Sequence, residues 1–497
     1  MRCFVAMVAI GALAGCATVA SPLREHLESP APSVRACGSW YAALDQAIDA
    51  AAVRDAQEAR IAGFPYLRAN RLLSALKERA ADSESAVQAL AVRLAALDHA
   101  ARIAEIGNLP EADVAGLPEL VVSGSRAEAL SRTRDCARLL KEIDMAKPHV
   151  RRMLLERARV PDDYSSGLRL AGLYFLTRIP FASGVRRWED EMKAVFARAE
   201  DDTRRPAVRY APPPAPRPAG PPGRPLVPAA ENPLGMPEPQ ADDLADLIAA
   251  HAPSFEIEIG GDHDRFGELR WLRERDVPAV DASRHVVYAQ ASHTLYRGRV
   301  LLQLVYTLWF PERPPREPGD LLAGTLDAVM WRVTLSPQGE PLIYDTIHAC
   351  GCFHMFFPTA RARALAAPDR LEEWAFVPQQ LPRVSAGERP LVRIASGTHY
   401  VERVALVRGT DSVARYQLRD YDELRSLMRL DGGSRSAFRP DGMIAGTERA
   451  ERYWFWPMGV RSAGAMRQWG RHATAFVGRR HFDDADLFER RFEFDLR

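Results

Sequence analysis

Apolar and polar residues follow two different periods along this chain, and the change of period falls near residue 200. From about residue 39 to residue 199, leucine, isoleucine, valine and alanine recur every three to four positions, with charged residues on the opposite face. This pattern predicts amphipathic helices, which breaker-rich stretches at 63–67 and 108–119 separate. We expect a bundle of five to seven helices, with the clearest helical periods in residues 41–61, 68–80, 85–106 and 131–160.

Beyond residue 240 the period becomes two, and β-branched and aromatic residues become frequent. Such alternation is typical of strands, and residues 336–340 have the composition of a hairpin turn. We predict short helices at 358–367 and 420–430. The predicted strands lie in residues 254–261, 284–296, 299–310, 327–336, 341–357, 390–406 and 473–482. The fold class that follows is α+β, with an N-terminal helical bundle and a C-terminal, mostly antiparallel β domain.

A proline-rich stretch lies between the two patterns. Residues 206–240 contain 13 of the 37 prolines, and a stretch with so few apolar side chains favours extended polyproline conformers. We therefore predict a semi-rigid linker over residues 201–240. Because 497 residues are enough for two or three domains, we place a helical domain at 16–200 and a β-rich α+β domain at 241–497.

The first residues have the pattern of a secretory signal peptide. Arg2 supplies a positive charge, and the apolar run from residue 4 to residue 14 is too short to span a bilayer as a helix. The run ends in the sequence LAGC at residues 13–16, which resembles the lipobox of bacterial lipoproteins. An ordinary secreted protein, cut near the sequence ATVAS, is the alternative.

The resemblance to the lipobox implies an anchored protein. In that family the chain is cut just before the lipobox cysteine, which is acylated, so residues 1–15 would be a signal peptide and Cys16 would carry the lipid. Lipoproteins of the inner membrane resemble one another in having Asp after the cysteine, whereas this chain has Ala17. We therefore expect a lipid anchor in the bacterial outer membrane, with the protein facing the periplasm. Several acyl chains together exceed the threshold for stable anchoring.

Charge and motifs exclude some common functions. The 66 Lys and Arg residues nearly balance the 65 Asp and Glu residues, so no overall field favours nucleic acid, and we predict no nucleic-acid partner. The sequence contains no Walker loop, no GxSxG motif and no GxGxxG motif after a strand, which argues against the commonest phosphate, hydrolase and dinucleotide sites.

The cysteines are informative in an oxidising compartment. With Cys3 removed and Cys16 acylated, four cysteines remain, and disulfides persist in the periplasm. A bridge between Cys37 and Cys136 is the most economical pairing because both lie in the N-terminal region. It would close a loop of about 100 residues and stabilise the fold by a few kcal/mol.

The sequence YDTIHACGCFHMFF concentrates ligand-type side chains around a glycine. His348, Cys350, Cys352 and His354 occupy every second position, so in an extended strand they project from one face. A straight strand would spread them too far apart for one metal ion, and all four converge only if Gly351 bends the chain. Thiolates and imidazoles suit Zn²⁺ or Cu⁺. Further ligands would come from the strand-like segments that contain His293 and His399.

Other interpretations of this stretch stay open. Cys350 and Cys352 could form a labile disulfide if the glycine tightens the turn. A cysteine nucleophile with His348 or His354 as its base is a third interpretation, and a buried structural role for all four side chains is the fourth. The aromatic sequence at residues 453–457 favours core packing, although it could line an apolar pocket or a sugar platform.

Two functional hypotheses follow. In the first, the β-rich domain is a non-catalytic binding or structural module of the envelope, whose partner is an envelope protein or a cell-wall component. In the second, it is a Zn- or Cu-binding protein or metalloenzyme that uses the HxCxCxH cluster, with a thiol redox site as the further alternative. The sequence does not decide whether the protein is an enzyme.

Overall fold

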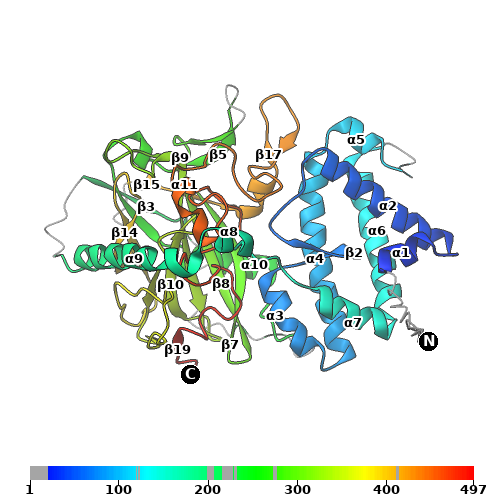
Figure 1. Cartoon of the computed structure of the whole chain (residues 1–497), viewed down its shortest axis with the longest axis horizontal. Coiled ribbons are helices and arrows are strands. Elements are labelled where there is room, and N and C mark those ends of the chain that lie inside the picture. The colour runs from blue at the N-terminus through cyan, green and yellow to red at the C-terminus, as the bar shows by residue number, and fades with distance from the viewer. Residues whose placement is uncertain are drawn as a thin grey trace, which may run out of the picture.

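A computed structural model describes residues 21–118, 120, 124–198, 206–214, 226, 228, 232–272, 277–409 and 414–497. The predicted signal peptide and the acylation site Cys16 lie outside these residues. Helices form the N-terminal half and mostly antiparallel sheets form the C-terminal half, which confirms the predicted α+β class (Figure 1). Among the helices of the described residues, none is long and apolar enough to cross a membrane.

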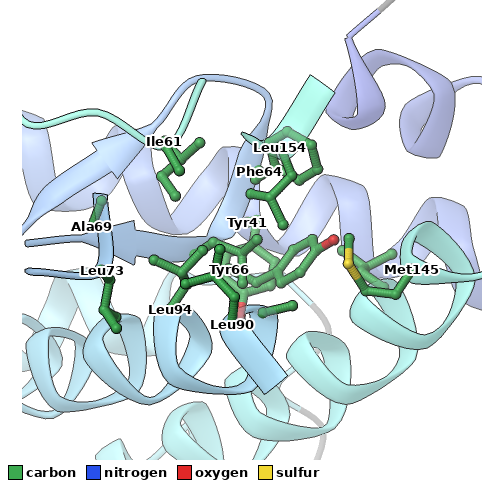
Figure 2. Close-up of a cluster of buried hydrophobic side chains, with 14 of the residues drawn as sticks. Tyr41, Ile61, Phe64, Tyr66, Ala69, Leu73, Leu90, Leu94, Met145 and Leu154 are labelled. Carbon is green, nitrogen blue, oxygen red and sulfur yellow. The ribbon is translucent and has the colours of Figure 1, made fainter. Parts of the chain in front are cut away.

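The N-terminal part, which we call the helical unit, contains seven helices and one hairpin. The helices are α1 (Pro22–Leu27), α2 (Pro32–Ala50), α3 (Arg71–Ala80), α4 (Glu84–Asn108), α5 (Glu111–Ala115), α6 (Arg126–Met145) and α7 (Pro148–Arg157). Side chains of Asn70, Ser83 and Ser125 cap α3, α4 and α6, each by accepting a backbone N–H of the first turn. Figure 2 shows the core of this unit, in which Tyr41 and Tyr66 pack with apolar side chains of α4.

The hairpin in the helical unit was not predicted. Strands β1 (Ala59–Ile61) and β2 (Phe64–Ala69) occupy the end of the predicted helix 41–61 and the breaker that follows it. Gly63 makes the connection with φ +87°, a conformation that glycine adopts at no steric cost. Phe64, Tyr66 and Leu67 are buried, so the hairpin contributes to the core between the helices.

A disulfide joins two of the helices. Cys37 of α2 is bonded to Cys136 of α6, 99 residues further along the chain. The pairing predicted from the sequence is therefore confirmed. The bridge links the first long helix of the helical unit to one near its end.

The largest sheet has six strands in the order β11-β10-β9-β8-β7-β16. Every neighbouring pair is antiparallel except β16 and β7, which run parallel. The strands are β7 (Val286–Tyr296), β8 (Arg299–Arg313), β9 (Gly324–Leu335), β10 (Pro341–His348), β11 (Met355–Pro358) and β16 (Gln417–Asp420). The predicted strands from residue 284 to residue 336 are confirmed, and so is the hairpin turn at 336–340, which joins β9 to β10. The predicted strand at 341–357 is instead divided into β10 and β11 by a turn at 349–354.

A second sheet of five strands has the order β14-β13-β4-β3-β15. Its strands are β3 (Ala207–Ala211), β4 (Ser254–Glu258), β13 (Glu388–Ile394), β14 (Val401–Arg408) and β15 (Ala414–Arg415). Side chains of both sheets form one core, because Phe255 and Val392 of the second sheet cluster with Leu304 and Trp331 of the first. The opposite face of the six-stranded sheet is buried by C-terminal residues such as Phe482.

Short elements complete this part of the chain. The remaining strand pairs are β5 (Glu268–Trp271) with β6 (Pro278–Asp281), β12 (Ala362–Ala364) with β19 (Phe492–Phe494), and β17 (Leu427–Met428) with β18 (Ser434–Arg435). The short helices are α10 (Ala241–His251), η2 (Asp262–Asp264), η3 (Tyr421–Arg425), α11 (Arg452–Phe455) and η4 (Trp456–Met458).

Three local predictions are corrected here. Residues 473–482 form a loop with one isolated bridge instead of a strand, the predicted helix at 358–367 contains β12, and 420–430 contains η3 and β17. These segments lie against other parts of the fold, and packing there overrides the local pattern.

The boundary between the two parts also differs from the prediction. Helices α8 (Ser166–Ala171) and α9 (Tyr174–Phe196) fall within the predicted helical domain, yet Met192 of α9 is buried in the core between the two sheets. Strand β3 lies within the predicted linker and pairs with β4. We therefore call the part from α8 to β19 the β-rich unit. A helical period identifies a helix but does not tell which core buries its apolar side.

Candidate functional site

Gly351 bends the HxCxCxH stretch, as the metal hypothesis required. Strand β10 ends at His348, residues 349–354 form a turn, and β11 begins at Met355. Gly351 has φ +92°, and a side chain at this position would overlap the carbonyl of Ala473. Inside the turn, the N–H of Gly351 donates to the carbonyl of His348 at 2.7 Å. The bend changes the direction of each side chain that follows it.

His354 belongs to a separate buried network. Its Nε2 lies 2.8 Å from Oδ2 of Asp345, to which Arg332 also donates at 2.6 Å. Burial lowers the pKa of His354 to about 3, although the hydrogen bond with Asp345 opposes the shift. The imidazole is therefore neutral at physiological pH and is hydrogen-bonded to the carboxylate of an Arg–Asp pair.

His348 and His399 share one carboxylate. Nδ1 of His348 lies 3.2 Å from Oδ1 of Asp327, and Nδ1 of His399 lies 2.9 Å from Oδ2 of the same residue. On its other side, His399 faces Oδ1 of Asp264 at 3.5 Å. Burial alone would lower the pKa of His399, but its bonds to Asp264 and Asp327 outweigh burial and raise it. The two carboxylates that flank this imidazole favour its protonated form, so the arrangement is consistent with side-chain pairing alone.

His293 belongs to neither of these networks. It lies on β7, its Nε2 is 2.9 Å from the carbonyl of Pro237, and it lines a cavity whose walls contain neither cysteine. The six predicted ligands are thus distributed over four different surroundings. Within the described residues, no group of three or more His, Cys, Asp or Glu side chains could hold a metal ion. The structure does not bring the six side chains to a single Zn or Cu ion.

The two cysteines of the turn do lie together. Cys350 is buried, Cys352 is half-buried, and both are free thiols. The backbone N–H of Cys352 donates to Sγ of Cys350 at 3.4 Å. A hydrogen bond with the Cys350 thiol, together with burial, raises the pKa of Cys352 well above its usual value. Cys352 is therefore protonated at neutral pH, and within the described residues neither His348 nor His354 forms a hydrogen bond with either thiol that would let it act as the base.

A buried carboxyl group near the thiols has no partner. Glu451 is 2% exposed, and its side chain makes no hydrogen bond or ion pair with any of the described residues. Burial raises its pKa to about 7, although the charges of Arg449, Arg313 and Arg467 oppose the shift. We call these residues the thiol cluster: Arg313, Cys350, Cys352, Arg449, Glu451 and Arg467. Its members come from four segments, so no sequence motif could have identified Glu451.

Carboxylates at the junction of the two units are paired instead. Arg425 of η3 donates to Oδ1 and Oδ2 of Asp55 at 3.2 and 2.8 Å, and to Oε2 of Glu58 at 3.1 Å. Gln468 also donates to Asp55, at 2.7 Å. Asp55 and Glu58 precede β1, so these bonds tie the helical unit to the β-rich unit. We call Asp55, Glu58 and Arg425 the junction cluster.

A cavity of about 580 Å³ lies beside the junction cluster, between the two units. Helices α3 and α4 of the helical unit form one wall, and α10 and β7 of the β-rich unit form the other. Apolar residues dominate these walls: Leu72, Leu73, Ala96, Leu97, Ala100, Leu244, Ala245, Ile248, Ala289, Ala291 and Leu418. The cavity was not predicted, because its lining comes from segments that are remote in the sequence.

The arginines and the two glutamines of the cavity differ in their partners. Its arginines are paired with carboxylates: Arg71 with Asp163 and Asp483, Arg93 with Glu238, Arg419 with Glu268 and Glu423, and Arg425 with Asp55 and Glu58. Oε1 of Gln57 and Nε2 of Gln290, in contrast, are buried and have no hydrogen-bond partner in the described part of the chain. One acceptor and one donor are therefore left for a ligand.

Comparison with protein-family models, with curated proteins and with solved structures found no match for this chain. The functional argument therefore rests on the geometry of the protein itself.

Proposed function

We propose that this protein is a lipid-anchored component of the bacterial outer membrane that faces the periplasm and binds a small amphipathic molecule without changing it chemically. The single observation that supports binding is the cavity between the two units. Its volume of about 580 Å³ lies within the range of small-molecule sites. The lipobox-like sequence at residues 13–16 supports the anchor, and the Cys37–Cys136 disulfide fits an oxidising compartment.

The lining of the cavity favours a neutral ligand. Its arginines are already neutralised by carboxylates, so a charged ligand would have to compete with existing ion pairs. The apolar part of a ligand would lie between α4 and α10, and an amide or hydroxyl group would bond with Gln57 and Gln290. We expect the molecule to come from the envelope or the cell wall, because the proposed anchor holds the protein there.

Binding is tested with the fluorescent probe N-phenyl-1-naphthylamine, which is neutral and amphipathic. Ala96 and Ala100 lie one turn apart on α4 and line the cavity, so Ala96→Trp and Ala100→Trp place an indole in the space that the probe would use. We expect each variant to weaken saturable binding by at least about tenfold. Ile103 lies on the same helix, is exposed and does not line the cavity, so Ile103→Trp is the matched control.

Equal binding by all four proteins would place the probe elsewhere and contradict a role for the cavity. The absence of any saturable signal would contradict a site for neutral amphipathic ligands.

The anchor is tested separately, by growing cells with radioactive palmitate. The proposal predicts label on the wild-type protein and none on Cys16→Ser. Label that persists in this variant, or its absence from the wild type, would exclude acylation at Cys16.

Reversible oxidation of the thiol pair is a second candidate function, favoured by the placement of Cys350 and Cys352 in one turn. Oxidation would join the two sulfur atoms and release two protons and two electrons to a disulfide of another protein, which is thereby reduced to two thiols. A thiol count before and after treatment with oxidised glutathione tests this candidate. Metal analysis of the same sample tests the Zn or Cu alternative. If a metal is bound through the thiols, Cys350→Ser and Cys352→Ser should abolish its binding.

A further inference from the structure

Large apolar side chains are exposed on one face of the β-rich unit. Leu170 is 80% exposed, Phe175 63% and Trp454 66%. Eight of the fourteen exposed large hydrophobic residues in the described part of the chain lie on α8, α9, α11 and η4 or in the short connection between α8 and α9. We call them the apolar face: Leu170, Leu173, Phe175, Leu176, Ile179, Tyr453, Trp454 and Trp456.

Close packing beneath the apolar face joins the two segments that form it. Gly172, between α8 and α9, lies directly against Pro457 of η4, and a side chain at this glycine would overlap the proline. Arg169 of α8 donates from Nε to the carbonyl of Met458 at 2.8 Å. The rings of Phe181 and Phe455 are 5.1 Å apart, in an edge-to-face arrangement. The helices α8, α9 and α11 therefore lie together around η4 (Figure 1), and their exposed side chains come from neighbouring elements.

The two halves of α9 use apolar residues in opposite ways. In the second half, Met192 is buried between the sheets, and the ring of Trp188 lies 5.4 Å from that of Phe376. In the first half, Phe175, Leu176 and Ile179 are exposed to solvent, although the second half of the same helix packs in a core. An exposed apolar area of this kind on a soluble unit marks a surface that contacts another apolar phase.

Basic residues accompany the apolar residues of this face, whereas the acidic residues of α9, Glu189, Asp190 and Glu191, follow in its second half. Residues 164–188 contain Arg169, Arg178, Arg186 and Arg187 and no acidic residue. Residues 452–461 contain two further arginines and no acidic residue. Arg186 and Arg187 are exposed. Basic residues that flank exposed tryptophan, tyrosine, leucine and isoleucine have the composition of helices that lie in the headgroup region of a membrane.

We propose that the apolar face docks on the surface of an anionic phospholipid bilayer. Leu173, Phe175, Leu176 and Ile179 would enter the boundary between headgroups and acyl chains, Trp454 and Trp456 would lie at headgroup level, and the arginines would bind lipid phosphates. The contact differs from the proposed acyl anchor, since it uses the folded β-rich unit instead of residue 16. It would fix the orientation of the unit relative to the membrane, which a flexible lipid tether alone does not do.

The test measures co-sedimentation of the full-length chain with vesicles of phosphatidylethanolamine and phosphatidylglycerol. Every protein carries Cys16→Ser, so no acyl chain contributes and all N-termini are identical. We expect the double variant Phe175→Glu/Trp454→Glu to bind at least about tenfold more weakly. The control Met428→Glu/Leu430→Glu changes two exposed apolar residues outside the apolar face, so its binding should equal that of the parent.

A second variant tests the charge contribution without touching apolar residues. Arg186→Glu/Arg187→Glu should reduce binding to the anionic vesicles and have little effect on vesicles of phosphatidylcholine. Circular dichroism and thermal unfolding verify that each variant is folded. Because palmitate labelling is not used here, failure of this proposal and failure of the anchor are separate results.

Unchanged binding by both double variants would overturn the proposal. Light scattering tests whether a second copy of the chain, instead of a membrane, covers this surface. A dimer that Phe175→Glu/Trp454→Glu converts to a monomer, with vesicle binding unaffected, would assign the face to a second copy of the chain instead of a membrane.

Discussion

The junction cluster and the thiol cluster each contain a buried glutamate with a pKa near 7, but the two glutamates differ in their partners. At Glu58, burial and the neighbouring Asp55 raise the pKa to about 7, while Arg425 donates directly to the carboxylate. At Glu451, burial raises the pKa to about 7, and the surrounding arginines act only through their charge. A raised pKa therefore reports burial in both places, whereas the hydrogen bonds tell which carboxyl group the fold uses.

This comparison distinguishes a carboxyl group that is bonded within the fold from one that has no bonding partner. The junction cluster holds two units together with directional bonds, so its charges are committed to the fold. The thiol cluster contains a carboxyl group and two thiols that no other described residue engages through an ion pair. The difference predicts that disruption of the first cluster costs stability, whereas neutralisation of Glu451 increases it.

The largest effect is expected from Arg425→Met. This change leaves Asp55 and Glu58 buried without their cation, which should lower the free energy of unfolding by about 3–5 kcal/mol. Urea unfolding followed by circular dichroism measures the loss. Arg408→Met removes an exposed ion pair with Glu388 and should cost no more than about 1 kcal/mol. Similar losses in the two variants would contradict the structural role of the junction cluster.

An intermediate effect is expected from Asp327→Asn, which lies beside the thiol cluster. The amide loses the charge that faces His399 and Arg449, so the free energy of unfolding should fall by about 2–3 kcal/mol. The pKa of His399 should also fall, because one of the two carboxylates that raise it is gone. A titration of the imidazole resonances by NMR measures the shift. A pKa that is unchanged would show that Asp264 alone holds the charged imidazole.

The most diagnostic effect, of the opposite sign, is expected from Glu451→Gln. A carboxyl group whose pKa is raised from 4.5 to about 7 on folding binds protons more readily in the folded state. Its contribution to stability is therefore complete below pH 4.5 and is lost as the pH rises to 7. The variant should equal the wild type near pH 4 and exceed its stability by about 3 kcal/mol at pH 8.

Thermal and urea unfolding of Glu451→Gln at both pH values provides the measurement, with Glu58→Gln as the comparison. The second variant removes the same kind of titration but also an ion pair with Arg425, so its gain at pH 8 should be smaller. A gain at Glu58 that equals the gain at Glu451 would remove the distinction between the two clusters.

Much of the fold was predictable from the period of apolar residues. The helical period between residues 39 and 160 corresponds to the long helices α2, α4 and α6, and the period of two identified β7 to β10. The hairpin β1–β2 escaped because it is short and lies inside a helical pattern. Helices α8 and α9 lie within the region of helical period but were assigned to the wrong unit, because their contacts are with residues that follow much later in the chain.

The candidate site was much less predictable. The concentration of His and Cys around Gly351 indicated a bend at this glycine, and the structure contains that bend. The partner of each side chain comes from another segment. His354 is hydrogen-bonded to Asp345, whereas His348 and His399 are both hydrogen-bonded to Asp327. His293 lines the cavity between the two units. The cavity itself has no local signal, since helices of one unit and a strand of the other must meet to form it.

By itself, the sequence determined the long helices and strands, the α+β class and the pairing of Cys37 with Cys136, because periodicity and turn composition act over a few residues and two cysteines in one region leave few pairings. Only the tertiary structure decided which carboxylate meets which cation, where the two units enclose a space, and which apolar helix face is left uncovered. These outcomes depend on contacts between distant segments. Such contacts form when the chain buries its apolar surface as a whole, and no short stretch of residues specifies them.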